Sequence, residues 1–188
     1  MTSLQWPEAV QAAAQGSDVE LSVTKLARMK WFRSPESQKQ DAEAAIQRFL
    51  SQLGTGSLPI RWLDKQEAAA FIAGYELIND PIWVHLYGIP QTIKDAADAA
   101  CGQKLIAFTM NDVPEHLFHV IYDAAFHAFE PQGHPVISHV VAAALYLTSL
   151  SISWDAICSE SNPLEGLMEV LKLGYLPLGA KDGAFYLI

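Results

Sequence analysis

The residues best suited to chemistry lie on one predicted helix between Asp112 and Glu130. At about 100° per residue, an arc of about 80° on the helical wheel carries imidazole and carboxylate groups. Its members are His116, His119, Asp123, His127 and Glu130. The opposite arc, about 160° wide, is apolar and contains Leu117, Phe118, Val120, Ile121, Ala124, Ala125 and Ala128. This pattern predicts a helix whose apolar arc lies in the core and whose polar arc is available for chemistry.

The polar arc has the spacing of a metal site. Neighbouring members are three or four residues apart, so their side chains project from successive turns. Imidazole and carboxylate groups bind divalent metals such as zinc. The predicted ligands are His116, His119, Asp123 and His127. A metal held in this way lowers the pKa of bound water and favours hydrolysis, with Glu115 or His139 as a general base or a support for a ligand.

Two other interpretations of the polar arc compete with a metal site. The chain has no H-E-x-x-H motif, and no acid at a fixed spacing outside the helix completes a ligand set. The face opposite a core stripe is usually exposed to solvent. It can also be a pH-sensitive or partner-binding face, because residues 105 to 171 contain no Lys or Arg and histidine protonates near pH 6.5. His139, between Ile137 and Val140, is expected to be a hydrogen-bonded core residue.

Motifs of common enzyme classes are missing from the sequence. It contains no G-x-S-x-G elbow, no G-x-x-x-x-G-K-[ST] loop and no G-x-G-x-x-G fingerprint. Cys101 and Cys158 are isolated thiols, which indicates a reducing compartment rather than a disulfide framework. The first residues lack the features of a secretory signal. These observations favour a non-catalytic protein of the cytoplasm.

Residues 25–33 form the one dense basic cluster of the sequence, with Lys25, Arg28, Lys30 and Arg33 around Trp31 and Phe32. Basic side chains with interleaved aromatic rings can grip a phosphate or an acidic partner. The alternative is the outer face and last turn of an amphipathic helix, where cations also suit the helix dipole.

Helix-start signals recur along the chain, each with a side-chain acceptor and often an acid three residues later. They occur at Ser17, Ser34, Asp64, Asp112 and Asn162. The segment after Ser34 carries a stripe of period 3.6 made of Ala45, Ile46, Phe49, Leu50 and Leu53. Thr92–Cys101 has the pattern of a further helix. The apolar segment Pro135–Leu150 is expected to be the central buried helix, because it falls short of the ~20 residues that span a bilayer.

The carboxyl-terminal end predicts a β-hairpin, since two apolar runs flank the turn-rich residues 179–183. The predicted fold is therefore mainly α, with about six to eight helices and a C-terminal β-hairpin. The alternative is an α+β fold with a small sheet, in which the short apolar runs Leu58–Leu63 and Lys104–Thr109 pair with the hairpin. Residues 1–188 are expected to form a single globular domain, with the loop near 54–58 as the one weak internal boundary.

The charge balance restricts the partners. A net charge of −9, from 21 acids and 12 basic residues, repels phosphate backbones and anionic lipid. Nucleic acid and membrane are therefore not expected partners. The leading hypothesis is a cytoplasmic interaction or regulatory protein, of the adaptor or immunity kind, whose acidic surface binds a more basic protein. A homo-oligomer formed through an exposed hairpin edge is a related possibility. The alternative function is a metal-dependent hydrolase built on the 113–129 helix.

Overall fold

The computed structural model describes residues 19–29, 31–33, 36–52, 54, 56–74, 113–157 and 161–188. The α-helices in these ranges are α2 (Val19–Ala27), α3 (Lys39–Gln52), α4 (Lys65–Ala73), α7 (Val113–Phe129), α8 (His134–Ile157) and α9 (Glu165–Lys172). The strands are β1 (Ile60–Trp62), β2 (Pro177–Lys181) and β3 (Ala184–Leu187). Short 3-10 turns, Glu36–Gln38 and Glu130–Gln132, precede α3 and follow α7. The prediction of a mainly α fold with a C-terminal hairpin is confirmed.

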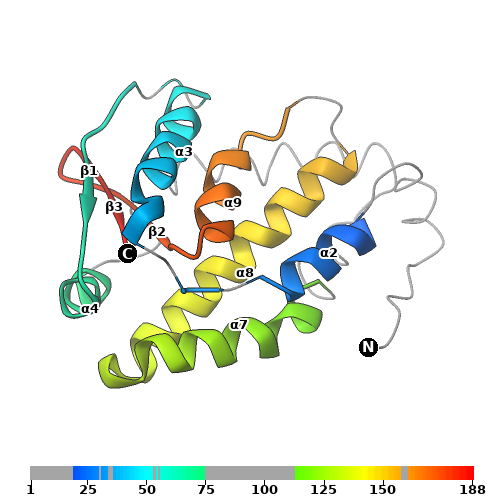
Figure 1. Ribbon diagram of the computed structural model, residues 1–188, viewed down its shortest axis with the longest axis horizontal. Coiled ribbons are helices and arrows are strands. Elements are labelled where there is room, and N and C mark those ends of the chain that lie inside the picture. The colour runs from blue at the N-terminus through cyan, green and yellow to red at the C-terminus, as the bar shows by residue number, and fades with distance from the viewer. Residues whose placement is uncertain are drawn as a thin grey trace.

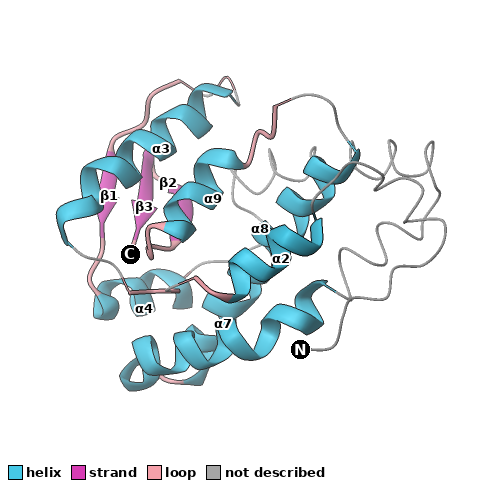
Figure 2. Cartoon of the chain, turned by 45° about the vertical axis from the view of Figure 1, so that its right-hand side comes forward, coloured by secondary structure: helices cyan, strands magenta, loops and turns pink. Residues whose placement is uncertain are grey.

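Helix α8 is the axis of the molecule (Figure 1). Helices α7 and α2 lie along one side of it, and α9 lies against the other. Helix α3 packs on α9, and its buried side also contacts the sheet, where Phe49 meets Phe185. The sheet lies at the opposite end of the described structure from α2 (Figure 2). Four residues of the predicted stripe of α3 are buried as expected, Ala45, Ile46, Phe49 and Leu50, and the fifth, Leu53, lies outside the described residues. One continuous apolar cluster joins the helices to the sheet.

The sheet has the strand order β1-β3-β2. Strands β2 and β3 form the predicted antiparallel hairpin, but its turn is shorter than the predicted residues 179–183, because β2 continues to Lys181. Both residues of the turn, Asp182 and Gly183, have positive φ. This conformation matches the twist of two-residue hairpins. Strand β1, from the apolar run Leu58–Leu63, adds to β3 in parallel, with Ile60 opposite Phe185. The other run proposed for the sheet, Lys104–Thr109, lies outside the described residues.

Helix α8 confirms the predicted central helix but extends beyond the predicted end at Leu150. Its polar residues do not end it, because small hydroxyl side chains bond back to the helix: Thr148 Oγ1 donates to the oxygen of Ala144 at 2.8 Å. Because the helix is longer than predicted, the expectation that it is too short to span a membrane is wrong. His134–Ile152 is long and apolar enough by composition, but 67% of that window is buried inside the protein. Such burial is typical of the core helix of a soluble protein.

Two of the helix-start signals lie in the described residues. Asp64 forms the predicted capping box of α4: its side chain accepts from the backbone of Gln66 and Glu67, and Glu67 accepts from the backbone of Asp64. Asn162 Oδ1 accepts from the backbone of Leu164 at 2.9 Å just before α9. The signals at Ser17, Ser34 and Asp112 and the predicted helix Thr92–Cys101 lie outside the described residues, as do both cysteines.

The loop near 54–58 is tied to the helix before it. Gln47 Nε2 donates to the oxygen of Leu58 at 2.8 Å, and Ser57 Oγ donates to Gln47 Oε1 at 2.9 Å. Elements on both sides of the loop pack against the C-terminal part of the chain, α3 against α9 and β1 against β3. The single domain over residues 1–188 stays a prediction, because residues 1–18 and 75–112 lie outside the described ranges.

Candidate functional site

The histidine and carboxylate side chains of α7 are exposed, on the side away from the core. They are the predicted ligands His116, His119, Asp123 and His127, together with Glu115. Glu130, in the 3-10 turn that follows α7, is also exposed. Among the described residues, no three His, Cys, Asp or Glu side chains lie close enough to hold one ion. The reason is the helix itself, because a rise of about 1.5 Å per residue separates His119 from His127 by about 12 Å. Metal binding by this set stays a prediction, and the chain folding found here does not bring the ligands together.

An aromatic ladder runs beside these polar groups on α7. It consists of Phe118, Tyr122 and Phe126, whose rings stack at consecutive spacings of four residues. The ring centroids are 5.6 Å apart for the first pair and 6.4 Å apart for the second. Phe118 is 40% exposed and Phe126 is 38% exposed, and they are the two large apolar side chains of the described residues that are this exposed. The ladder is therefore a contiguous apolar strip on the surface.

The sequence prediction that Phe118 belongs to the core is wrong. Phe118 is at the edge of the predicted apolar arc, while Leu117, Ile121 and Ala125 nearer its centre are fully buried. Among the described helices, α8 and α2 pack against one side of α7, and its opposite side lies at the lower edge in Figure 1. In the sequence, the i, i+4, i+8 spacing of Phe118, Tyr122 and Phe126 already indicates a row of aromatic side chains beside the aliphatic stripe.

The ladder and the polar arc form one surface. His119 lies edge-on to the ring of Phe118, with centroids 5.6 Å apart, and His127 lies edge-on to Phe126 at 6.1 Å. We call the surface made by the ladder, His119, Asp123 and His127 the α7 face. The exposed carboxylates of Glu115 and Glu130 stand near its two ends. At the C-terminal end Lys65 of α4 donates to the oxygen of Ala128, so its ammonium group is engaged by the helix terminus.

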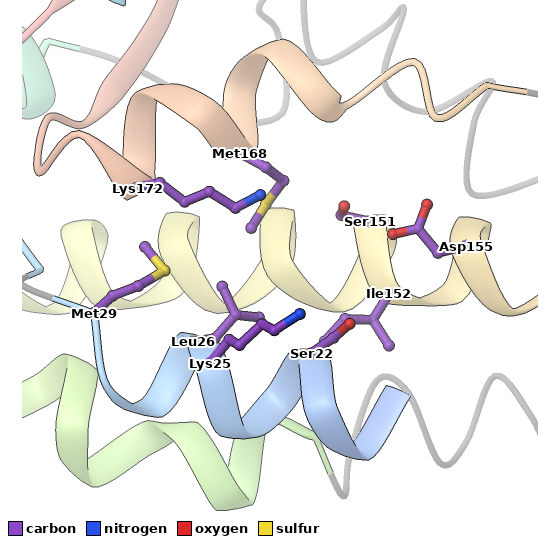
Figure 3. Close-up of a pocket in the computed structure, with 9 residues that line it drawn as sticks. All are labelled: Ser22, Lys25, Leu26, Met29, Ser151, Ile152, Asp155, Met168 and Lys172. Carbon is purple, nitrogen blue, oxygen red and sulfur yellow. The ribbon is translucent and has the colours of Figure 1, made fainter. Parts of the chain in front are cut away.

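A pocket of about 420 Å³ is the second candidate site, and it lies between α2, α8 and α9 (Figure 3). Its apolar lining comes from Leu26, Met29, Ile152 and Met168. Its polar lining comes from Ser22, Lys25, Ser151, Asp155 and Lys172. Residues far apart in the chain therefore build one cavity. The basic cluster of residues 25–33 contributes Lys25 and Met29 to this cavity, but the sequence does not show that the cluster meets α8 and α9.

Asn162 organises the polar end of the pocket. Its Nδ2 donates to Ser151 Oγ at 2.8 Å and to Asp155 Oδ1 at 2.9 Å. Burial raises the pKa of Asp155, while the bond from Asn162 and the charge of Lys172 lower it and the charge of Glu165 raises it. The start of α9 is thereby held to the C-terminal half of α8, and the Asp155 carboxylate has a fixed position at the pocket wall.

The residues of the basic cluster 25–33 do not form one binding surface, because its aromatic rings pack within the protein while its arginines are exposed. Trp31 is 1% exposed and its Nε1 donates to the oxygen of Leu26 at 2.9 Å, so it is a core residue. Phe32 packs edge-on against Phe129, with centroids 5.9 Å apart. Neither ring is presented for stacking on a ligand. Arg28 and Arg33 are exposed, Lys25 lines the pocket, and Lys30 lies outside the described residues.

No family model, curated protein or solved structure matches this chain. Of the two candidate sites, the α7 face presents apolar area to solvent, and the pocket encloses a volume suited to a small molecule.

His139 is half-buried on α8, and burial lowers its pKa below 6.5. The folded protein therefore holds this ring neutral, whereas the unfolded chain protonates it as the pH falls through about 6.5. The contribution of His139 to the free energy of unfolding is therefore fully present above pH 6.5, and it is lost as the pH falls towards the pKa of His139 in the folded protein. We expect the free energy of unfolding to decrease between pH 7.5 and pH 5, and to decrease less in His139→Gln, when measured by urea denaturation.

The control for this prediction is His134→Gln, which changes an exposed histidine at the start of the same helix. It should leave the pH dependence as it is in the wild type. An equal decrease in His139→Gln and the wild type would contradict the burial of His139.

Proposed function

We propose that this chain is a non-catalytic cytoplasmic interaction or regulatory protein that binds a partner protein through the α7 face. The observation that carries the proposal is the aromatic ladder, in which Phe118, Tyr122 and Phe126 stack in a continuous row on the surface. Single exposed apolar residues are common, but contiguous exposed apolar patches mark binding surfaces. Aromatic residues are also enriched among those that contribute most to protein–protein affinity.

The charges around the ladder indicate the chemistry of the partner. The exposed acids beside the ladder are Glu115 and Asp123 of α7 and Glu130 of the 3-10 turn that follows, and α7 carries no Lys or Arg. A partner with cationic side chains around an apolar strip complements both features. Its Lys and Arg groups would pair with the carboxylates or lie over the aromatic rings, as cation–π contacts do. A basic amphipathic helix has this arrangement.

The wider charge distribution supports a protein partner over nucleic acid or an anionic membrane. The net charge of −9 repels both polyanions at long range, whereas it attracts a basic protein. A metal-dependent hydrolase remains the alternative from the sequence, and no described geometry favours it.

The test uses a dye-labelled synthetic amphipathic helix of leucine and lysine, with fluorescence anisotropy as the readout. We expect binding in the micromolar range that weakens as salt is raised from about 50 to about 500 mM. The double variant Phe118→Ser/Phe126→Ser should weaken binding at least tenfold, because it removes the rings that the peptide buries. Asp123→Asn should weaken it about threefold, as expected for an exposed ion pair.

The matched control is Asp41→Asn, the same change at an exposed aspartate in the first turn of α3. It should leave peptide affinity unchanged. Equal binding of a glutamate analogue of the peptide, or unchanged affinity of the double variant, would contradict the proposal. So would a concentration-dependent dimer in sedimentation that Phe126→Ala abolishes, since the ladder would then bind a second copy of the chain.

A further inference from the structure

We propose that the pocket between α2, α8 and α9 binds a small monoanion with an apolar body, whose carboxylate lies between the ammonium groups of Lys25 and Lys172. This site is independent of the α7 face, since the two share no residue. Its volume of about 420 Å³ falls within the range of about 300–1,000 Å³ of typical small-molecule sites.

The walls of the pocket suit an apolar body. Leu26 and Met29 contribute from α2, Ile152 from α8 and Met168 from α9. The two thioether side chains are flexible and polarizable, so they adapt to ligands of different shape. An alkyl chain or an aromatic ring would lie against these four side chains and leave its polar head at the other part of the cavity.

Figure 3 shows two lysine side chains reaching into this space from opposite walls, Lys25 from α2 and Lys172 from the last turn of α9. Both extend towards the end of the pocket where Ser151 and Asp155 lie. Two ammonium groups beside an apolar wall form an arrangement that selects an anion with an apolar tail. Such a site contrasts with the acidic character of the chain as a whole.

An anionic ligand would compete with nearby carboxylates of the protein for the lysine ammonium groups. Asp155 is bonded by Asn162, and its charge interacts with those of Lys172 and Glu165. Asp155 is therefore partly satisfied by neighbours in the protein. An anion that enters between the lysines gains two cationic partners and approaches one carboxylate, so removing that carboxylate should strengthen its binding.

The experiment follows the methyl signals of Met29 and Met168 by NMR in protein labelled with 13C at the methionine methyl groups. Met29→Leu and Met168→Leu assign the two signals. Titration with octanoate should shift both, with a dissociation constant at or below about 1 mM. 3-Phenylpropionate distinguishes an aromatic from an alkyl body, and a shift with either acid supports the site. Octylammonium, with the same chain and the opposite charge, should bind at least tenfold more weakly.

Variants of the charged lining test the carboxylate position. Lys25→Met and Lys172→Met should each weaken octanoate binding about tenfold, because each removes one charged partner. Asp155→Asn keeps an oxygen to accept from Asn162 and should strengthen binding several-fold. Arg28→Met is the matched control, since it removes an exposed cation of the same helix region that does not line the pocket. Thermal denaturation checks that each variant is folded.

Three results would overturn the proposal. The first is no shift of the two methyl signals with either acid at about 5 mM, a concentration that detects millimolar affinity. The second is binding of octylammonium as tight as that of octanoate, which would assign the site to cations or to apolar molecules in general. The third is an equal effect of Arg28→Met and Lys172→Met, which would place the anion outside the pocket.

Discussion

Replacing Gly166 by alanine should lower the free energy of unfolding by about 2–3 kcal/mol, as overpacking of a close contact does. Helix α9 approaches α3 so closely at this point that a Cβ on residue 166 would overlap the backbone oxygen of Ala45. It would also lie 3.0 Å from the Cβ of Phe49. Neither neighbour is the flexible end of a side chain. The two helices must therefore move apart, which opens the core around Phe49.

Urea denaturation of wild type, Gly166→Ala and Gly74→Ala measures this effect. Gly74, at the end of α4, has a negative φ, and a Cβ there would meet its nearest atom at 3.6 Å. The same substitution should therefore change stability by no more than about 0.5 kcal/mol at that position. Equal midpoints for the two variants would contradict the close packing of α3 on α9. The exposed ion pair of Arg48 with Glu169 across the same helices would not compensate, because exposed pairs contribute little.

Replacing Phe185 by alanine should cost about 3–5 kcal/mol of unfolding free energy, the range found when a buried phenylalanine is truncated. Phe185 is 1% exposed and belongs to the central strand of the sheet. Its ring lies edge-on to Phe49 of α3, with centroids 6.4 Å apart. Truncation leaves a cavity between sheet and helices and removes an aromatic pair, so both the transfer energy and the packing energy are lost.

The matched control is Phe126→Ala, the same change on the exposed aromatic ladder of α7. It should alter the unfolding free energy by less than about 1 kcal/mol, because the ring is already partly in water. Chemical denaturation followed by tryptophan fluorescence compares the two. Similar losses in both variants would contradict either the burial of Phe185 or the exposure of Phe126, and a solvent-accessibility measurement on Phe126→Cys would identify which.

The parts of the fold predicted from the sequence are those that depend on neighbouring residues. The capping box of Asp64 and Glu67 needs only residues three apart, and the stripe of α3 needs only the period of the helix. The turn at Asp182 and Gly183 sets the hairpin in the same way. Helix α8 continues past the predicted end at Leu150, where Ser151, Ile152 and Trp154 are buried against other parts of the chain, which hydropathy does not reveal.

The polar face of α7 was also predicted from the sequence, down to the exposure of His119, Asp123 and His127. Whether such groups converge depends on a second element reaching the same point. Within the described residues no second element brings a third ligand to the same point, so metal binding by this set stays a prediction. The exposure of Phe118 also depends on other elements. A helical wheel shows which residues share a face of α7, but it does not show how much of that face the neighbouring helices cover.

Only the tertiary structure decided the features that join distant parts of the chain. The pairing of β1 with β3 brings Ile60 opposite Phe185, and the pocket combines Lys25 of α2 with Lys172 of α9. Local sequence determines the conformation of a segment, because propensity, capping and turn geometry act over a few residues. Contacts across more than a hundred residues depend instead on which apolar surfaces bury one another, and many pairings of short elements satisfy the same local pattern.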